Sequence, residues 1–117
     1  MPTSFEQFCQ TIASLRGPQG CPWDREQNHK TLIRYLLEET YEVLEAINAD
    51  DFDKLKEELG DLLLQIVLQA QLGSEKGNFN IEDIIESINK KMIGRHPHVF
   101  STKEIKTSEE VLNQWEQ

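Results

Sequence analysis

The chain has 117 residues, with 21 acidic side chains against 12 basic ones and a formal net charge of −9. This length fits a single domain, expected over residues 1–117, and the negative charge argues against a nucleic-acid polymer or an anionic membrane as a partner. The first residues lack a signal-peptide pattern, and no apolar run approaches the ~20 residues of a membrane span, so we expect a cytoplasmic protein.

The first predicted element is a short amphipathic helix, whose apolar residues recur at steps of three and four: Phe5, Phe8, Ile12 and Leu15. The pattern stops before Gly17. Residues 17–28 contain two prolines and two glycines, which predicts a long loop, and a loop of this length in a small domain is often functional. Trp23 supports such a role. Cys9 and Cys21 lack the spacing of a zinc site and are predicted to be thiols.

Two long helices follow, joined by a short turn. The first covers about residues 29–48, with one apolar face made of Ile33, Leu36, Leu37, Thr40, Leu44 and Ile47. The second begins after Asp50 or Asp51, either of which can cap it, and runs to about Lys76. The short connection predicts antiparallel neighbours. Because the apolar residues between 62 and 68 point in nearly every direction, we expect a second copy of the chain to complete a bundle as a homo-oligomer.

The rest of the chain predicts shorter helices and no strand. A fourth helix is expected over about residues 81–94, with a buried stripe made of Ile84, Ile85, Ile88 and Met92. Pro97 is expected to end regular structure. A short terminal helix begins near Ser108 and carries Trp115. The predicted fold class is therefore all-α.

Acidic side chains are concentrated on the two long helices. Helical spacing places those of the first helix on one strip beside its apolar face: Glu38, Glu39, Glu42 and Glu45. On the second helix, Glu58 and Asp61 are three residues apart at the edge of the apolar block. In an antiparallel pair, the acids of the first helix and those of the second can lie at the same height along the helix axes and surround one point. Such like charges destabilise the fold unless a cation neutralises them, and Mg²⁺ or Mn²⁺ prefers oxygen ligands.

Other interpretations of these acids remain open. The alternative function is a non-catalytic helical oligomerisation module, whose acids are a solvated surface with pairs at i,i+4: Arg34 with Glu38, and Lys54 with Glu58. A solvated role is favoured for Glu45 and Glu57. A ligand role is favoured for Asp61, because its side of the helix becomes apolar within two turns. His96 and His98 flank a proline and are expected to be loop or phosphate-facing groups rather than metal ligands.

Four segments carry a family resemblance: GPQGCPWD at 17–24, EETYE at 38–42, ELGD at 58–61 and RHPHVF at 95–100. In this order they resemble the MazG family of nucleoside triphosphate pyrophosphohydrolases, over almost the whole chain. The resemblance implies an all-α fold that forms dimers or tetramers through its long helices. It also implies Mg²⁺ dependence and hydrolysis of nucleoside triphosphates to monophosphate and pyrophosphate. The base and the sugar stay undecided.

The resemblance further implies roles for single residues. It assigns the metal ligands to Glu39, Glu42, Glu58 and Asp61. Glu38 and Glu39 are expected to be the catalytic acids, with Glu38 an additional ligand or the group that orients the attacking water.

Substrate-binding roles follow from the same resemblance. Lys91 and Arg95 match basic positions expected to hold phosphates. Trp23 and Trp115 are candidates to stack on the base, and packing in the core is an equal alternative for Trp115.

Overall fold

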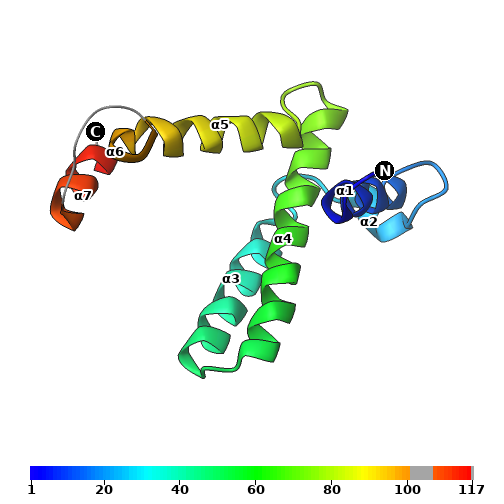
Figure 1. The fold of residues 1–117 in the computed structure, drawn as a ribbon. Helices are drawn as coiled ribbons and strands as arrows, with labels where there is room; N and C mark the ends of the chain where they lie inside the picture. The colour runs from blue at the N-terminus through cyan, green and yellow to red at the C-terminus, as the bar shows by residue number, and fades with distance from the viewer. Residues whose placement is uncertain (101–106, 117) are drawn as a thin grey trace. The chain divides into compact units, whose positions relative to one another are not determined.

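The structure, a computed structural model, describes residues 1–100 and 107–116, with side chains described as far as residue 113. The described residues form helices and no strand, which confirms the all-α prediction. In chain order the helices are α1 (Ser4–Leu15), α2 (Pro22–Glu26), α3 (Ile33–Asn48), α4 (Phe52–Glu75), α5 (Ile81–Gly94), α6 (Pro97–Phe100) and α7 (Ser108–Glu116) (Figure 1). They belong to two compact units, Met1–Asn80 and Ile81–Gln117, which are described separately. None of the described helices is both long and apolar enough to cross a membrane.

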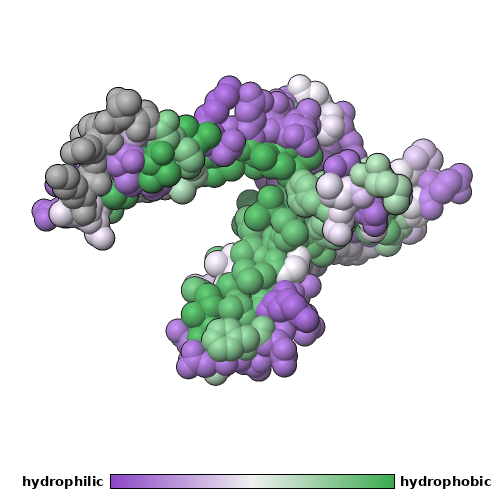
Figure 2. Space-filling model, viewed as in Figure 1, coloured by the Kyte–Doolittle hydropathy of each residue, from purple (hydrophilic) through white to green (hydrophobic). Residues whose placement is uncertain are grey.

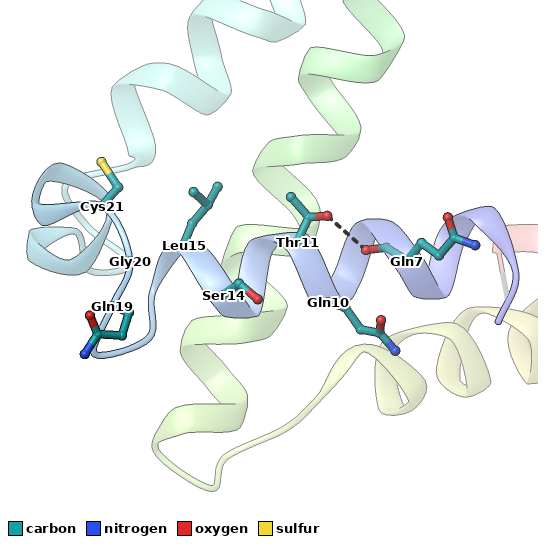
Figure 3. Close-up of a pocket in the computed structure, with 8 residues that line it drawn as sticks. All are labelled: Gln7, Gln10, Thr11, Ser14, Leu15, Gln19, Gly20 and Cys21. Carbon is teal, nitrogen blue, oxygen red and sulfur yellow. Dashed lines mark hydrogen bonds between the residues drawn. The ribbon is translucent and has the colours of Figure 1, made fainter.

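α1 begins at a polar cap and ends where the chain folds back on it. The Thr3 hydroxyl accepts a hydrogen bond from the Glu6 backbone N–H at 3.1 Å, which satisfies one donor of the first turn. After the helix, the Cys21 N–H donates to the Leu15 carbonyl at 2.8 Å, so the loop lies against the end of α1 (Figure 3). Gly20 makes the closest approach, because a Cβ there would lie 2.1 Å from the Leu15 oxygen.

The segment 17–28, predicted to be loop throughout, contains the short helix α2. Pro22 lies in the first turn of this helix. The fixed φ of proline suits that position, and its missing N–H leaves no intrahelical bond unmade. The proline that suggested a loop therefore starts a helix.

α3 begins at Ile33 rather than near residue 29 as predicted. The Asn28 side chain accepts hydrogen bonds from the backbone N–H groups of Lys30 and Thr31, both at 2.9 Å. Asparagine commonly stabilises a turn in this way. This capped turn takes the place of the expected first turn of the helix.

α3 and α4 lie side by side, and the turn 49–51 joins them (Figure 1). The Asp51 side chain caps α4 by accepting a hydrogen bond from the Lys54 backbone N–H at 3.1 Å, as the sequence predicts. α4 ends at Glu75, and Lys76 is its C-cap, which confirms the predicted end.

The core of the first unit lies around α1 and α4. It is built from five buried side chains, Ile12, Leu32, Val67, Leu68 and Leu72. At the end of α4 the ring of Phe79 packs on Gly73, where a Cβ would lie 2.6 Å from the ring. Cys9 and Cys21 are thiols rather than disulfide partners, as predicted.

The predicted apolar face of α3 is largely uncovered by the other residues of the first unit. The residues of α3 that are buried are Val43 and Ala46, whereas Ile33, Leu37 and Leu44 expose 60%, 56% and 48% of their surface. The reason is that α3 meets α4 through the side that carries its buried residues, so the predicted stripe lies on a flank. Periodicity alone identified an apolar face but not its partner.

We call the exposed apolar side chains of the two long helices the open apolar face: Ile33, Leu37, Tyr41 and Leu44 of α3 with Leu59, Leu63 and Ile66 of α4. Figure 2 shows apolar side chains gathered over these helices. The prediction that the apolar block of α4 points in many directions is confirmed, because Val67 and Leu68 are buried while Leu63 and Ile66 are exposed.

In the second unit, the predicted stripe of α5 is not buried either, and Ile85, Ile88 and Met92 are exposed. Among the described residues of this unit, only the short helix α6 packs closely against α5, and it is too short to cover the stripe. Pro97 begins α6 instead of ending regular structure, since proline is suited to a first helical turn. α7 begins at Ser108, as predicted.

Candidate metal centre

Three carboxylates from two helices converge in the first unit. α3 supplies Glu39, and α4 supplies Glu58 and Asp61, which are three residues apart and therefore on one side of the helix. One oxygen from each side chain lies within 4.8 Å of the others. Glu58 is buried, at 7% exposure, and the other two acids are half-buried. This arrangement offers oxygen ligands at a spacing that a divalent cation can bridge.

Burial and like charge act together on this group. The pKa of Glu39 is raised above its ordinary value of 4.5, first because burial removes water from the carboxylate and then because the charges of Asp61 and Glu58 repel its ionised form. Lys54 approaches from one side, with its Nζ 3.7 Å from Oε1 of Glu58. One lysine does not balance three converging acids. The group therefore keeps an excess of negative charge that a bound cation would relieve.

The other acids that the sequence singles out lie around this group in different ways. Glu42 is half-buried, and its charge also raises the pKa of Glu39, but it is outside the set of oxygens within 4.8 Å. Glu38 is exposed and pairs with Arg34 at 3.1 Å, as the i,i+4 spacing predicts. Glu45 is exposed, as expected of a solvated acid, and so is its counterpart on α4, Glu57.

One turn beyond Asp61, α4 buries a polar side chain that was not predicted. Gln65 is 6% exposed and lies four residues after Asp61, on the same side of the helix. Its Oε1 is buried and has no hydrogen-bond partner among the described residues. A buried acceptor without a donor is costly. The one signal of Gln65 in the sequence is that a polar residue stands within an apolar block.

An aromatic pair lies one turn before Glu39 on α3. Trp23 of α2 meets Tyr35 edge-on, with ring centroids 5.7 Å apart and ring planes at 83°. Tyr35 precedes Glu39 by four residues and shares its side of α3. Trp23 keeps 47% of its surface exposed, so much of its ring is accessible. Tyr35 was not singled out from the sequence, because a tyrosine within a predicted amphipathic helix is not unusual.

A separate hollow of about 620 Å³ lies on α1 and the loop that follows it (Figure 3). Most of its lining side chains are polar and uncharged: Gln7, Gln10, Thr11, Ser14 and Gln19. The converging acids take no part in this lining. The hollow and the carboxylate group are thus two distinct features of the first unit.

Residues 27–100 match the MazG nucleotide pyrophosphohydrolase domain. This segment is more than half of the chain and contains the three converging carboxylates. The chain belongs to the MazG family. Membership agrees with the resemblance that the four sequence segments indicate.

Relatives and a solved structure agree with the MazG assignment. The chain is 54% identical to the nucleoside triphosphate pyrophosphohydrolase of Escherichia coli (strain K12), over 97% of its own length and 43% of that relative. It is 53% identical to the nucleoside triphosphate pyrophosphohydrolase/pyrophosphatase MazG of Thermotoga maritima, over 82% of its own length and 38% of that relative. The chain thus spans less than half the length of these curated relatives. The crystal structure of a mazG-related protein from Thermotoga maritima is similar, with a TM-score of 0.73, 30% identity, and coverage of 94% of this chain and 95% of that one.

The basic residues that the MazG resemblance singles out belong to the second unit. Lys91 is exposed on α5, and Arg95 is half-buried directly after it. The Arg95 backbone N–H donates to the Lys91 carbonyl at 3.0 Å, so helical hydrogen bonding continues one residue beyond α5. Nδ1 of His96 lies 2.7 Å from the Met92 carbonyl oxygen, and the His96 and His98 rings have centroids 5.6 Å apart. The predicted base-stacking side chain of the terminal helix, Trp115, lies outside the described residues.

Proposed function

We propose that this chain hydrolyses nucleoside triphosphates, with ribose or deoxyribose, to nucleoside monophosphate and pyrophosphate, as housecleaning of the cytoplasmic nucleotide pool. The observation that carries the proposal is the convergence of Glu39, Glu58 and Asp61 from two helices. The names of the two relatives at 53% and 54% identity support the same activity. A non-catalytic helical module would gain nothing from bringing like charges together at a partly buried point.

Mg²⁺ is the proposed cofactor, with Mn²⁺ able to replace it. The proposed ligands are Glu39, Glu42, Glu58 and Asp61. Support comes from the three oxygens within 4.8 Å and from the all-oxygen donor set, which hard divalent cations prefer. Glu42 is the next acid whose charge acts on Glu39, which supports its place as the fourth ligand.

The proposed chemistry is attack of water on the α-phosphorus. Held by the proposed ligands, Mg²⁺ would supply positive charge to the triphosphate and activate water as a nucleophile. Glu38 and Glu39 are the proposed catalytic carboxylates: Glu38 orients the attacking water, and one of the two carboxylates acts as the base that accepts the proton of this water. The water oxygen bonds to the α-phosphorus while the bond from that phosphorus to the α–β bridging oxygen breaks. Pyrophosphate leaves, and the monophosphate keeps the new oxygen.

Four side chains are proposed to bind the rest of the nucleotide. Lys91 and Arg95 hold phosphates through their positive charges. Trp23 stacks on the base, which its 47% exposure permits, and Trp115 is a second stacking side chain. Base stacking is tolerant of sequence because every base has a π face, so these residues support a broad range of triphosphates.

A second copy of the chain is proposed to cover the open apolar face. In this arrangement α3 and α4 form an antiparallel pair that completes a helical bundle as a homodimer or a higher homo-oligomer. Support comes from the large apolar side chains exposed on two neighbouring helices, since monomeric proteins rarely expose contiguous apolar surface of this kind. The face belongs to the same two helices as the carboxylates.

Pyrophosphate release tests the proposed activity. The protein is incubated with Mg²⁺ and a panel of canonical and modified nucleoside triphosphates. Asp61→Asn removes one ligand charge with little change of shape and is expected to lower kcat by roughly a hundredfold or more. Glu57→Gln removes an exposed acid from the same helix and serves as the matched control, with its rate unchanged. Full Mg²⁺-dependent hydrolysis by Asp61→Asn contradicts the ligand assignment, and no release from any triphosphate contradicts the activity.

A further inference from the structure

Arg16 joins three segments of the first unit and has no part in the site described above. Its guanidinium forms two bonds to one carboxylate of α4, from Nε to Oε2 of Glu75 at 2.7 Å and from Nη2 to Oε1 at 2.8 Å. Its remaining nitrogen, Nη1, donates to the backbone carbonyls of Asp24 and Gln27, the latter at 3.1 Å. The Arg16 side chain is 8% exposed, whereas the Glu75 side chain keeps 35% of its surface exposed, so the guanidinium is shielded from water more than the carboxylate is.

The two carbonyls that Arg16 holds lie at the C-terminal end of α2. This helix has five residues, far fewer than a helix needs to persist by itself in water. Its conformation therefore depends on contacts with the rest of the unit. The Asp24 carbonyl accepts from the Gln27 N–H at 3.3 Å as well. The last carbonyls of a helix have no i+4 partner within it, and a cationic donor can contact them. Arg16 provides this contact and is itself anchored to α4 by Glu75.

α2 in turn fixes the orientation of Trp23. Nε2 of Gln27 donates to the Trp23 carbonyl at 2.9 Å, so the residue that Arg16 holds also holds the tryptophan backbone. The indole meets the Tyr35 ring edge-on, and Tyr35 is one turn from Glu39. A continuous series of contacts therefore connects Arg16 to the aromatic pair beside the carboxylates.

We propose that Arg16 is a positioning residue for the nucleotide, which sets the place of Trp23 by holding the C-terminal end of α2 against Glu75 of α4. The proposal rests on the proposed function, in which Trp23 stacks on the base. Arg16 contacts neither the substrate nor the acids. It therefore acts on binding that is equal in the ground state and the transition state, and its loss raises KM while kcat stays nearly constant.

Arg16→Lys tests this role without removing charge. Lysine keeps the attraction to Glu75 and to an anionic substrate, but it lacks the planar fork that reaches a carboxylate and two carbonyls together. KM for the triphosphate is expected to rise about tenfold, the size of one lost stacking contact, with kcat within about twofold. Arg25→Lys is the matched control, because Arg25 is an exposed arginine of α2 itself and its KM is expected to be unchanged.

Fluorescence of Trp23 gives a readout that needs no turnover. In a Trp115→Phe background Trp23 is the remaining tryptophan, since the chain has two. Trp23 exposes 47% of its surface, so its release from Tyr35 by Arg16→Lys is expected to increase acrylamide quenching by up to about twofold. Far-UV circular dichroism and the affinity for Mn²⁺ are expected to stay constant, because the carboxylates do not depend on α2.

Glu75→Gln provides a second variant if Arg16→Lys does not fold. It keeps one carbonyl acceptor for Arg16 but removes the charge, so the same changes in KM and quenching are expected at smaller size. Unchanged KM and unchanged quenching in both variants overturn the proposal. A fall in kcat or in Mn²⁺ affinity, with KM constant, also overturns it, because Arg16 would then support the acids. If the wild type releases no pyrophosphate, the proposed function fails, while the quenching comparison still decides whether Arg16 positions Trp23.

Discussion

The carboxylate of Glu39 is held where its charge is unfavourable, and this has a measurable consequence. Burial and the neighbouring Asp61 and Glu58 raise its pKa, so the ionised form opposes folding when no cation is present. We expect Glu39→Gln to raise the melting temperature of the metal-free protein at pH 7 by about 4 °C, the shift that ~1 kcal/mol of relieved repulsion produces in a domain of this size. Differential scanning calorimetry in a chelator measures this shift.

The same variant is expected to lose the stabilisation that Mg²⁺ gives the wild type. A ligand that binds only the folded state stabilises it by about 2.7 kcal/mol at 100 times its Kd. Removing one ligand charge weakens binding, so the melting temperature of Glu39→Gln changes little when Mg²⁺ is added. A lower melting temperature of the variant in chelator, together with a full response to Mg²⁺, contradicts the assignment of Glu39 as a ligand.

Gln65 also lowers the stability of the folded state, because its Oε1 is buried without a partner among the described residues. An unsatisfied buried acceptor costs about 1–3 kcal/mol. Gln65→Leu, which has a similar volume and no polar atom, is expected to raise the free energy of unfolding by about 1 kcal/mol in urea denaturation. Gln10→Leu, at an exposed position of α1, is the control and is expected to change stability little. Lower stability of Gln65→Leu would show that the folded protein supplies a donor to this oxygen.

Between elements, the ion pair of Arg16 and Glu75 links the end of α1 to the end of α4 and makes stability depend on pH. Hydrogen bonds from Arg16, despite partial burial, lower the pKa of Glu75 below its ordinary value of 4.5. The folded state then binds this proton less readily than the unfolded state does. The pair therefore contributes stability above pH 4.5, and the contribution is lost as the pH falls through the lower folded-state value.

Glu75→Gln is accordingly expected to be less stable than the wild type at pH 7, with the difference narrowing below about pH 4. Urea midpoints at a series of pH values measure the difference. Glu86→Gln is the control, because its pair with Lys90 is on the surface, at 64% and 75% exposure, and is expected to contribute little at any pH. A difference that stays constant from neutral to acidic pH contradicts the role of the Glu75 charge.

At the level of elements, local chemistry could be predicted from the sequence and packing partners could not. The Asp51 cap and the end of α4 follow from residue types within one turn. The helical start at Pro22 was missed because the same residue type favours loops and first helical turns. The buried side of α3 was missed because a periodic pattern identifies an apolar face without identifying the element that covers it.

For the whole molecule, spacing along single helices predicted part of the candidate site. Glu58 and Asp61 share a side of α4 because three residues nearly complete a turn, so their spacing alone predicts that they lie together. Contacts between distant segments have no such signal. Arg16 and Glu75 are 59 residues apart, and each by itself resembles an ordinary surface charge. Their pairing depends on how α1 crosses the end of α4.

The open apolar face leads to a prediction about the assembled protein. Leu37 lies within this face and exposes 56% of its surface in the single chain, so Leu37→Asp costs the isolated chain little. In a homo-oligomer, the same change places an unpaired charge in the interface, and we expect the dissociation constant to rise by roughly a hundredfold or more. Sedimentation velocity over a range of concentrations measures it, with Gln10→Asp on α1 as the control. An interface that buried an aspartate in place of this leucine would lose affinity. If Leu37→Asp sediments like the wild type at concentrations where the wild type is oligomeric, the contact between copies therefore lies elsewhere.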